Sequence, residues 1–292
     1  MARISSGHVI FEMNGKNKPA LTVENGVRVT FETLDCFSNT VLTNDDLVSS
    51  IDFAQVNPAT GPLYVEGAEP GNVLKVTVHE IRLADKGAIV TAPGLGILAD
   101  QIETEETVMC DVTDEFVDYK GIQLPLRKMI GVIGTAPAGE GVNTGTPGDH
   151  GGNLDTTRIT EGAVLYLPVN VPGALLALGD LHATMGDGEI MGAGLEIPGE
   201  VEVSVEVLKE FDLPLPLVET EDLWVTLGSR ESLEAASKLA TRQMAELIMA
   251  KSNLSFNQAG MLLSLAGNLH TSQVVNPNVT VRMELAKNIL EE

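Results

Sequence analysis

The chain has 292 residues, enough for one large domain or two moderate ones, and its hydrophobic fraction of 43% is that of a protein with a packed core. Its 41 acidic residues against 18 basic ones give a formal net charge of -23, which repels phosphate backbones and argues against nucleic-acid binding. No stretch approaches the roughly 20 consecutive apolar residues that cross a bilayer, so no membrane partner is expected.

Short strands are predicted for the first two thirds of the chain, because apolar and polar residues alternate there between turn signals such as Asn14-Gly15 and Asn25-Gly26. A helical turn is expected over Thr43 to Ser50. The expected strands are Ser6 to Glu12, Val27 to Thr33, Val73 to Ile81, Thr107 to Asp111, Glu115 to Tyr119, Met129 to Thr135, Ala163 to Val169, Ala174 to Leu178 and Val201 to Leu208.

The end of the chain has a different pattern. Ser229 to Lys251 carries apolar residues at helical spacing, with Ser229 or Ser232 as the N-cap, and Ser255 to Ala266 repeats the pattern before Gly267. Gln273 to Val281 alternates and predicts a last strand. These patterns predict an α+β fold, mainly antiparallel β in sandwich- or barrel-like sheets, with two C-terminal helices. We expect 1–292 to form a single unit, with a β-rich part at 1–212 and a mixed strand-helix part at 213–292.

The two cysteines, Cys36 and Cys110, form no Cys-x-x-Cys pair, and the N-terminus shows no signal-peptide pattern. These features indicate a cytoplasmic protein with reduced thiols. Motifs for other chemistries are missing from the sequence: it has no Gly-x-Ser-x-Gly elbow and no phosphate loop, and Gly186-x-Gly188 does not open a helix after a Rossmann strand. We therefore expect no organic cofactor.

The densest chemistry lies between Gly179 and Glu196, where four carboxylates and one imidazole are interspersed with glycines. In an extended segment, residues i and i+2 point to one face, so Asp180 and His182 are expected to reach one ion together. A second acidic-histidine segment, Asp149 to Asp155, is flexible enough at Gly151 and Gly152 to fold around a ligand. The alternative is that both segments are tight turns whose Asp and His side chains bond to backbone groups.

Imidazole and carboxylate ligands together suit a divalent metal, Zn²⁺ above all, and a carboxylate-only neighbour suits Ca²⁺. The candidate ligands are Asp35, His150, Asp180 and His182. Asp35 follows a predicted strand, where a carboxylate either faces a site or bonds to its own backbone in a turn.

Three sets of residues resemble the acetamidase/formamidase family in its own order: Asp149 to Asp155, then Leu167-Pro168-Val169, then Gly179 to Ala183 with Gly186-Asp187-Gly188-Glu189 and Glu196. Ser255 to Gln273 is also similar to the C-terminal helix region of the family. Met185 stands where the long formamidases often carry Gln, as in shorter bacterial members.

The resemblance implies hydrolysis of a short linear amide to a carboxylate and ammonia, by a β-rich homo-oligomer with metal at the acidic-histidine site. We take a dimer as the first expectation and a small neutral amide as the substrate. In this interpretation Glu196 or Asp155 moves the proton of a metal-activated water. Asn153, Gly151 and Gly152 orient the amide or hold the oxyanion, and Met185 contacts the substrate.

Two alternatives from other classes remain open. The first is a non-catalytic β-domain that binds a divalent cation or a small ligand through its carboxylate loops. The second is an oligomeric scaffold whose C-terminal helices form the interface.

Overall fold

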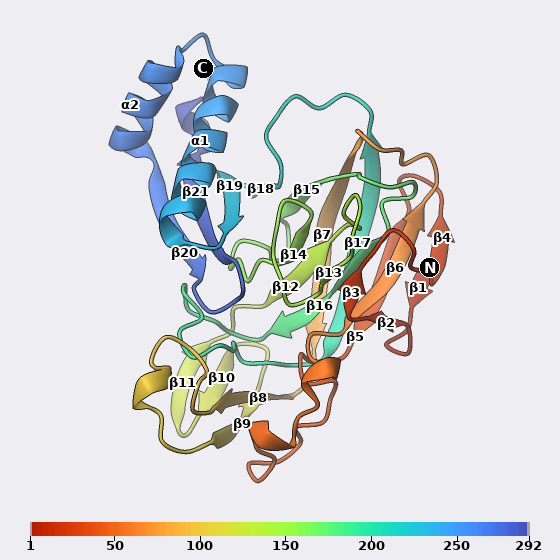
Figure 1. Ribbon diagram of the computed structural model, residues 1–292, viewed down its shortest axis with the longest axis vertical. Coiled ribbons are helices and arrows are strands. Elements are labelled where there is room, and N and C mark those ends of the chain that lie inside the picture. Colours follow the sequence, from red (N-terminus) through yellow and green to blue (C-terminus); the bar gives the residue numbers. More distant parts are fainter. Residues whose placement is uncertain (1, 291–292) are drawn as a thin grey trace.

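The computed structural model describes residues 2–290. Its largest sheet has nine strands, which come from the beginning, the middle and the end of the sequence (Figure 1). In spatial order its strands are β1 (Ala2–Ile4), β5 (Arg28–Thr33), β17 (Gly199–Leu208), β7 (Val73–Leu83), β15 (Val164–Pro168), β18 (Leu217–Glu219), β19 (Leu223–Arg230), β21 (Val279–Ala286) and β20 (Asn268–Gln273).

Three smaller sheets complete the β structure. A six-stranded sheet has the order β14 (Gly151–Asn153), β12 (Met129–Gly134), β16 (Leu176–His182), β6 (Ala59–Val65) and β2 (Val9–Ile10), with β4 (Leu21–Val23) also paired to β6. A four-stranded sheet has the order β11 (Ile122–Pro125), β10 (Phe116–Tyr119), β9 (Glu106–Val112) and β8 (Lys86–Thr91). The two-stranded sheet pairs β13 (Val142–Asn143) with β3 (Glu12–Met13).

Pairing is antiparallel throughout the described strands except between β1 and β5 and between β4 and β6. The helices α1 (Leu233–Lys251) and α2 (Phe256–Ala266) are the two α-helices of 2–290, and both lie near the C-terminus. Short 3₁₀ turns are η1 (Val48–Ser50), η2 (Phe53–Gln55), η3 (Ala99–Gln101) and η4 (Lys287–Ile289). The predicted α+β fold, mainly antiparallel β with two C-terminal helices, is therefore confirmed.

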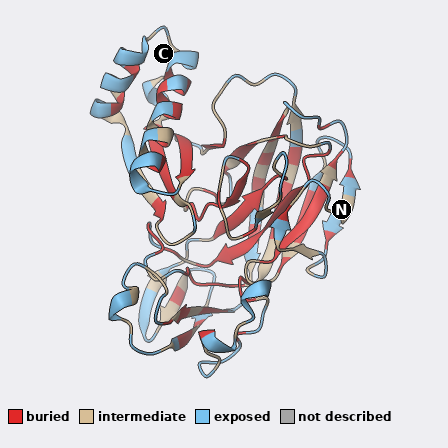
Figure 2. Ribbon diagram, viewed as in Figure 1, coloured by how far each residue is buried: buried red, intermediate tan, exposed pale blue. Residues whose placement is uncertain are grey.

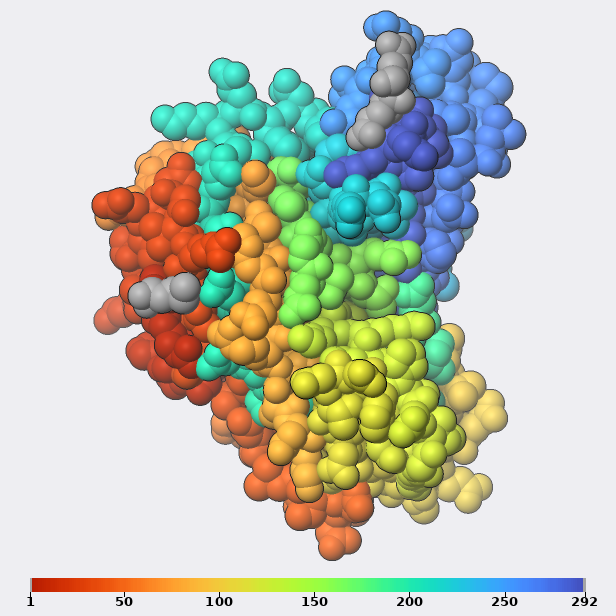
Figure 3. Space-filling model, turned by 180° about the vertical axis from the view of Figure 1, so that it is seen from behind, coloured from red at the N-terminus to blue at the C-terminus, as the bar shows by residue number. Residues whose placement is uncertain are grey.

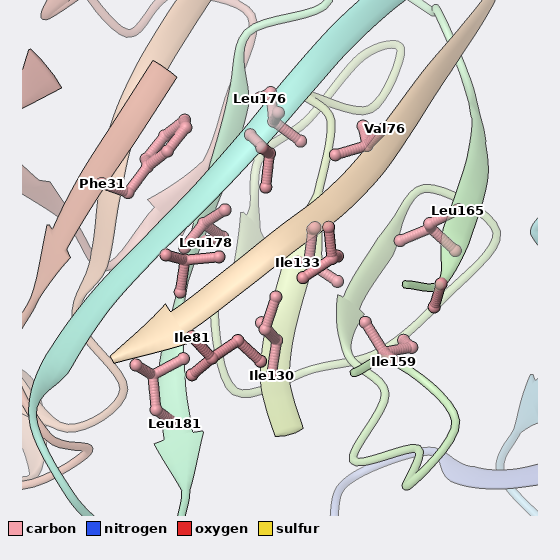
Figure 4. Packing of buried hydrophobic residues seen from close by; sticks show 14 of the residues in the cluster. Phe31, Val76, Ile81, Ile130, Ile133, Ile159, Leu165, Leu176, Leu178 and Leu181 are labelled. Carbon is pink, nitrogen blue, oxygen red and sulfur yellow. The ribbon is translucent and has the colours of Figure 1, made fainter. Parts of the chain in front are cut away.

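The main core lies between the nine-stranded and six-stranded sheets. Side chains such as Phe31 and Val76 from the first sheet meet Ile133 and Leu178 from the second, and all four are fully buried (Figure 4). The alternation that predicted these strands places every second side chain in this layer. Figure 2 shows that burial is concentrated along these two sheets, while the ends of the molecule carry more exposed surface.

The C-terminal helices pack on β19 and β21 and form a second core. The Ser232 side chain caps α1 by accepting from the Ala235 amide, and Ser255 and Gln258 form a capping box at the start of α2. Gly228 allows α1 to approach β19 closely, because a Cβ at this position would lie 2.4 Å from the Ala236 carbonyl oxygen. The helices (blue) lie at the opposite end of the molecule from β9 to β11 (yellow) in Figure 3.

One local expectation was wrong. The predicted strand from Gln273 to Val281 spans the end of β20, a bend and the start of β21, because Asn276-Pro277-Asn278 turns the chain back on itself. The helical turn expected over Thr43 to Ser50 is present as the 3₁₀ turn η1, confined to Val48–Ser50. Within residues 2–290, none of the helices combines the length and the apolar character that a membrane span requires.

Candidate functional site

Strand β16 carries the centre of the candidate site. Leu176, Leu178 and Leu181 of this strand enter the main core, so the usual alternation of two is broken once, between Leu178 and Leu181. Asp180 lies at this break with a positive φ of 57°, a left-handed conformation that short polar side chains tolerate better than most. The break leaves Asp180 and His182 outside the leucine cluster, and both are buried.

Gly131 of the neighbouring strand β12 makes room for two carboxylates. A Cβ at this position would lie 2.5 Å from Asp155 Oδ1 and 2.7 Å from Asp180 Oδ2. Any other residue would therefore collide with both acids. The apolar residues of β12, such as Ile130 and Ile133, pack in the main core. At position 131, in contrast, the nearby carboxylates require glycine.

His182 is fully buried, and Glu196 lies next to it. His182 Nε2 is 3.0 Å from Glu196 Oε1 and 3.5 Å from Asp180 Oδ1. Glu196 is held in place by backbone bridges to His182 on one side and Ala88 on the other, and its Oε1 accepts from the Gly194 amide at 2.9 Å. A Cβ at Gly194 would lie 2.5 Å from His182 Nδ1, so this glycine permits the close contact.

Asp155 and Asn153 come from the other predicted segment and join the same cluster. Asn276 Nδ2, from the bend between β20 and β21, donates to Asp155 Oδ2 at 2.7 Å. The Asn153 amide satisfies its neighbours when its nitrogen faces the acids: Nδ2 then donates to Asp180 Oδ2 at 2.9 Å and to Asp155 Oδ2 at 3.1 Å. The Asn153 oxygen in this orientation accepts from Asn57 and Asn276.

Six side chains form two adjacent groups that are able to bind a metal. Within each group the ligand atoms lie within 4.8 Å of one another, and all six residues are buried. One group contains Cys36, Asp180 and Glu196, and the other contains Asp155, His182 and Glu189.

Burial and mutual repulsion perturb the acids of the cluster. Desolvation raises the pKa of Glu196 to about 8 and that of Asp155 to about 6, and the charge of Asp180 adds to both effects. Burial also raises the pKa of Glu189 well above its ordinary value. Burial alone would lower the pKa of His182, but the carboxylates of Glu196 and Asp180 raise it well above the usual range. Several buried carboxylates at close range are typical of a site that binds a cation.

Several polar atoms of the cluster are buried without a hydrogen-bond partner in the described part of the chain. They are Asp180 Oδ1, both ring nitrogens of His182, Glu189 Oε2 and Glu196 Oε2. Leaving such atoms unpaired costs about 1–3 kcal/mol each. A divalent cation would satisfy the carboxylate oxygens and one imidazole nitrogen together, so the residues present fit a metal ion.

A cavity of about 380 Å³ lies against the cluster and reaches the surface. Asn153, Asp180, Glu189, Glu196 and Asn276 line its polar side. A small polar molecule in this cavity would therefore contact the acids directly.

Some residues proposed from the sequence lie elsewhere. His150 lines a separate groove with Asp149 and Arg230, and Arg230 Nη1 donates to Asp149 Oδ1 at 2.9 Å. Asp35 Oδ1 accepts from the amides of Phe37 and Asn39, the turn role of the alternative interpretation, but Asp35 is buried near the cluster, where burial and, to a smaller extent, the charge of Asp180 raise its pKa. Neither residue belongs to the two metal-binding groups.

The proposed substrate contacts Gly151, Gly152 and Met185 do not line this cavity. Gly151 and Gly152 pair with β12, and a Cβ at either position would collide with backbone atoms. Met185 lines a second, mainly apolar cavity of about 460 Å³ beneath the four-stranded sheet, and Glu189 of the cluster lines that cavity as well.

Cys36 and Asn276 were missed as members of the cluster. Cys36 lies shortly after the end of β5 and forms no Cys-x-x-Cys pair. Burial raises the pKa of its thiol well above the ordinary value, and the charges of Glu196 and Asp180, both distant in sequence, add to this shift. Asn276 lies in a turn that the alternating pattern concealed. No local motif could have pointed to either residue.

Comparison with known proteins gives a consistent result. The model of the acetamidase/formamidase family matches residues 16–140 and 138–292. The crystal structure of an acetamidase from Bacillus halodurans is 49% identical, with a TM-score of 0.97 over 99% of this chain and 98% of that one. The formamidase of Methylophilus methylotrophus is 27% identical over 64% of this chain and 61% of its own length. The acetamidase of Mycolicibacterium smegmatis is 26% identical over 65% and 63%.

The chain thus spans about three fifths of the length of these curated relatives. The family model, in contrast, covers nearly all of the chain, and the three family motifs that the sequence displayed all lie within the matched residues. The chain belongs to the acetamidase/formamidase family.

Proposed function

We propose that the protein is a metal-dependent amidohydrolase that cleaves linear amides of the acetamide and formamide type to a carboxylate and ammonia. The observation that carries this proposal is the buried cluster of acids around His182, whose unpaired atoms lie against an open cavity. Family membership and the names of the relatives support the same chemistry. A neutral amide also suits a chain with a net charge of -23, since no anion has to approach it.

The proposed ligands are Asp180 and His182, together with Glu189 and either Asp155 or Cys36. This set omits Asp35 and His150, because neither side chain belongs to the two groups of ligand atoms. Imidazole and thiol suit Zn²⁺, whereas a neighbouring position held by carboxylates alone would suit Ca²⁺. A bound divalent ion lowers the pKa of a coordinated water and polarises an amide carbonyl.

Glu196 is the proposed proton carrier. Its Oε1 accepts from the Gly194 amide and lies 3.0 Å from His182 Nε2, which leaves Oε2 free beside the cavity. Burial raises its pKa to about 8, so the carboxyl group is able to exchange a proton near neutral pH. In this role Glu196 accepts a proton from the attacking water and returns it to the departing amide nitrogen. Asp155, also buried in the cluster, is the alternative carrier.

Asn153 and Asn276 orient the acids and the substrate. With its nitrogen on the acids, Asn153 ties Asp180 to Asp155, and Asn276 donates to the same Asp155 oxygen, Oδ2. Both amides line the cavity, so they are also placed to hydrogen-bond an amide substrate. The oxyanion role considered for Gly151 and Gly152 is not part of this proposal.

The test is ammonia release from formamide, acetamide and propionamide, measured with the protein as purified, after thorough chelation, and after addition of Zn²⁺ or Ca²⁺. We expect release that is lost on chelation and restored by one of the ions. Activity that persists without metal would refute metal dependence. Stoichiometric metal without any ammonia release would instead support the non-catalytic cation-binding alternative.

We also propose that the protein is a homodimer. From Ser252 to Val281 the sequence carries no Asp, Glu, Lys or Arg, and Phe256, Met261, Leu265 and Leu269 are exposed there. Two strongly acidic copies repel each other, so an uncharged apolar face is where they can approach. Strand β20 lies at the edge of the nine-stranded sheet in the same region. Leu265→Glu should shift the mass in solution to the monomer, and an unchanged mass would contradict this interface.

A further inference from the structure

The cavity over the acidic cluster has two chemically different parts. Its inner side is polar and includes Asn153, Asp180 and Glu196. The remaining wall is largely apolar and comes from segments distant in sequence. The apolar lining residues are Phe37, Val48, Ile51, Phe53, Val56, Val90, Leu95, Val275 and Pro277.

The apolar wall is much larger than formamide or acetamide requires. The cavity volume is about 380 Å³, and nine apolar side chains line it. An amide group bound to the acids occupies a small part of this space.

Phe53 is placed for ligand contact by the local structure. Asp52 caps the 3₁₀ turn η2, because its Oδ1 accepts from the Ala54 amide at 3.0 Å and its Oδ2 accepts from Gln55 Nε2 at 3.1 Å. Phe53 therefore begins a fixed turn, yet 63% of its surface is exposed. A large aromatic side chain that is exposed at the mouth of a reactive cavity is typical of ligand recognition.

The charged residues of the cavity lining are the three acids Asp180, Glu189 and Glu196, and neither Lys nor Arg occurs among the lining residues of the described chain. An anionic acyl substituent would therefore meet no cationic partner in the cavity. A hydrocarbon chain that lies on the apolar side chains would be removed from water at little cost.

We propose that the preferred substrate is an amide whose acyl group is a hydrocarbon chain longer than acetyl, lying along Ile51, Phe53 and Leu95. This inference rests on the proposed function and specifies its substrate. The reaction is the same hydrolysis: water adds its oxygen to the carbonyl carbon, the carbon–nitrogen bond breaks, and the nitrogen leaves as ammonia with the proton it receives.

The test compares kcat/KM for acetamide, butanamide and hexanamide with the metal-loaded protein. Each methylene removed from water contributes about 0.8 kcal/mol, which corresponds to a rise of about fourfold in kcat/KM per methylene. A profile that is flat or falls beyond acetamide would overturn the inference while leaving the amidase proposal intact. If none of the amides, long or short, is hydrolysed, the proposed function itself fails.

Phe53→Ala tests the wall directly. The substitution should lower kcat/KM for hexanamide by about tenfold more than for acetamide, since a buried phenyl contact is lost only with the longer substrate. Leu42→Ala is the matched control, because Leu42 is 69% exposed and lies outside the cavity lining. This control should leave the ratio of the two values unchanged. If the ratio of kcat/KM for hexanamide to that for acetamide is the same in both variants, the acyl chain of the substrate does not lie against Phe53.

Discussion

His182 Nε2 lies 3.0 Å from Glu196 Oε1, although the imidazole belongs to β16 and the carboxylate to the segment that leads into β17. The backbone bridge between the same two residues fixes this distance from the main chain as well as from the side chains. A histidine and an acid held together in this way are unable to separate without disturbing both segments. We propose that His182 binds the metal and that Glu196 carries the proton.

Replacement of His182 tests the ligand assignment. His182→Ala removes the one imidazole of the cluster, so we expect the protein to lose bound metal and turnover together. Metal content measured after dialysis and ammonia release from acetamide provide the two readouts. His8→Ala is the matched control, because His8 is exposed and far from the cluster in the sequence. Full metal content in His182→Ala would contradict the assignment.

Replacement of Glu196 tests the proton carrier. Glu196→Gln keeps the shape of the side chain but removes its basicity, so kcat should fall by about 10²–10⁴-fold, the range for loss of a general base. The metal content should decrease less than in His182→Ala, because Asp155, His182 and Glu189 form a group without Glu196. A variant that keeps near-normal kcat would shift the proton-carrier role to Asp155, for which Asp155→Asn is the corresponding test.

Much of the site was predictable because parts of it are local in sequence. Asp180 and His182 are two residues apart, and side chains at this spacing in a strand point to the same face, so their proximity could be predicted. Asn153 and Asp155 were found for the same reason, since they lie in one glycine-rich segment. The strands themselves followed from alternation, although the left-handed backbone at Asp180 broke that alternation at the site itself.

The remainder depended on contacts that no local pattern contains. His150 shares a segment with Asp155, but it points into a groove beside Arg230, so the similarity of the two Asp-His segments was misleading. Cys36 and Asn276 join the cluster only because β5 and the bend after β20 are brought to β16 by the sheets. Fold-level packing, rather than spacing, selects these residues.

His150 predicts a specific acid sensitivity. Burial lowers its pKa from the ordinary 6.5 to about 4, so the imidazole is neutral in the folded protein where the unfolded chain already binds a proton. The unfolded state therefore binds more protons between pH 6.5 and 4, and stability falls as the pH decreases through that window. The loss is on the order of 2–3 kcal/mol at its lower end.

Urea unfolding at pH 7, 5.5 and 4.5 measures this effect. His150→Gln, which cannot take up a proton, should lose less stability than the unsubstituted protein on going from pH 7 to 4.5. His8→Gln provides the comparison for removal of an exposed imidazole. Parallel pH dependence in His150→Gln and the unsubstituted protein would show that His150 is not held neutral.

Arg282 and Asp187 link the cluster to the C-terminal strands. Arg282 is only 1% exposed and donates to both oxygens of Asp187, at 2.9 and 2.6 Å, and to Glu284. Asp187 precedes Glu189 by two residues, so this ion pair fixes the turn that brings Glu189 to the metal-binding group. Asp187→Asn should destabilise the protein by about 1–3 kcal/mol, because a buried guanidinium loses a charged partner.

The same variant should weaken metal binding by about 10–100-fold, the range for a residue that positions a ligand. Asp149→Asn is the matched control, since Asp149 pairs with the partly exposed Arg230 at the surface and such pairs contribute about 0–1 kcal/mol. Thermal unfolding and metal titration of the two variants separate a positioning role from a general loss of charge. Because Glu189 is brought to the site by a short turn rather than by a strand, equal metal affinity in both variants would mean that the turn holds its shape without the ion pair between Asp187 and Arg282.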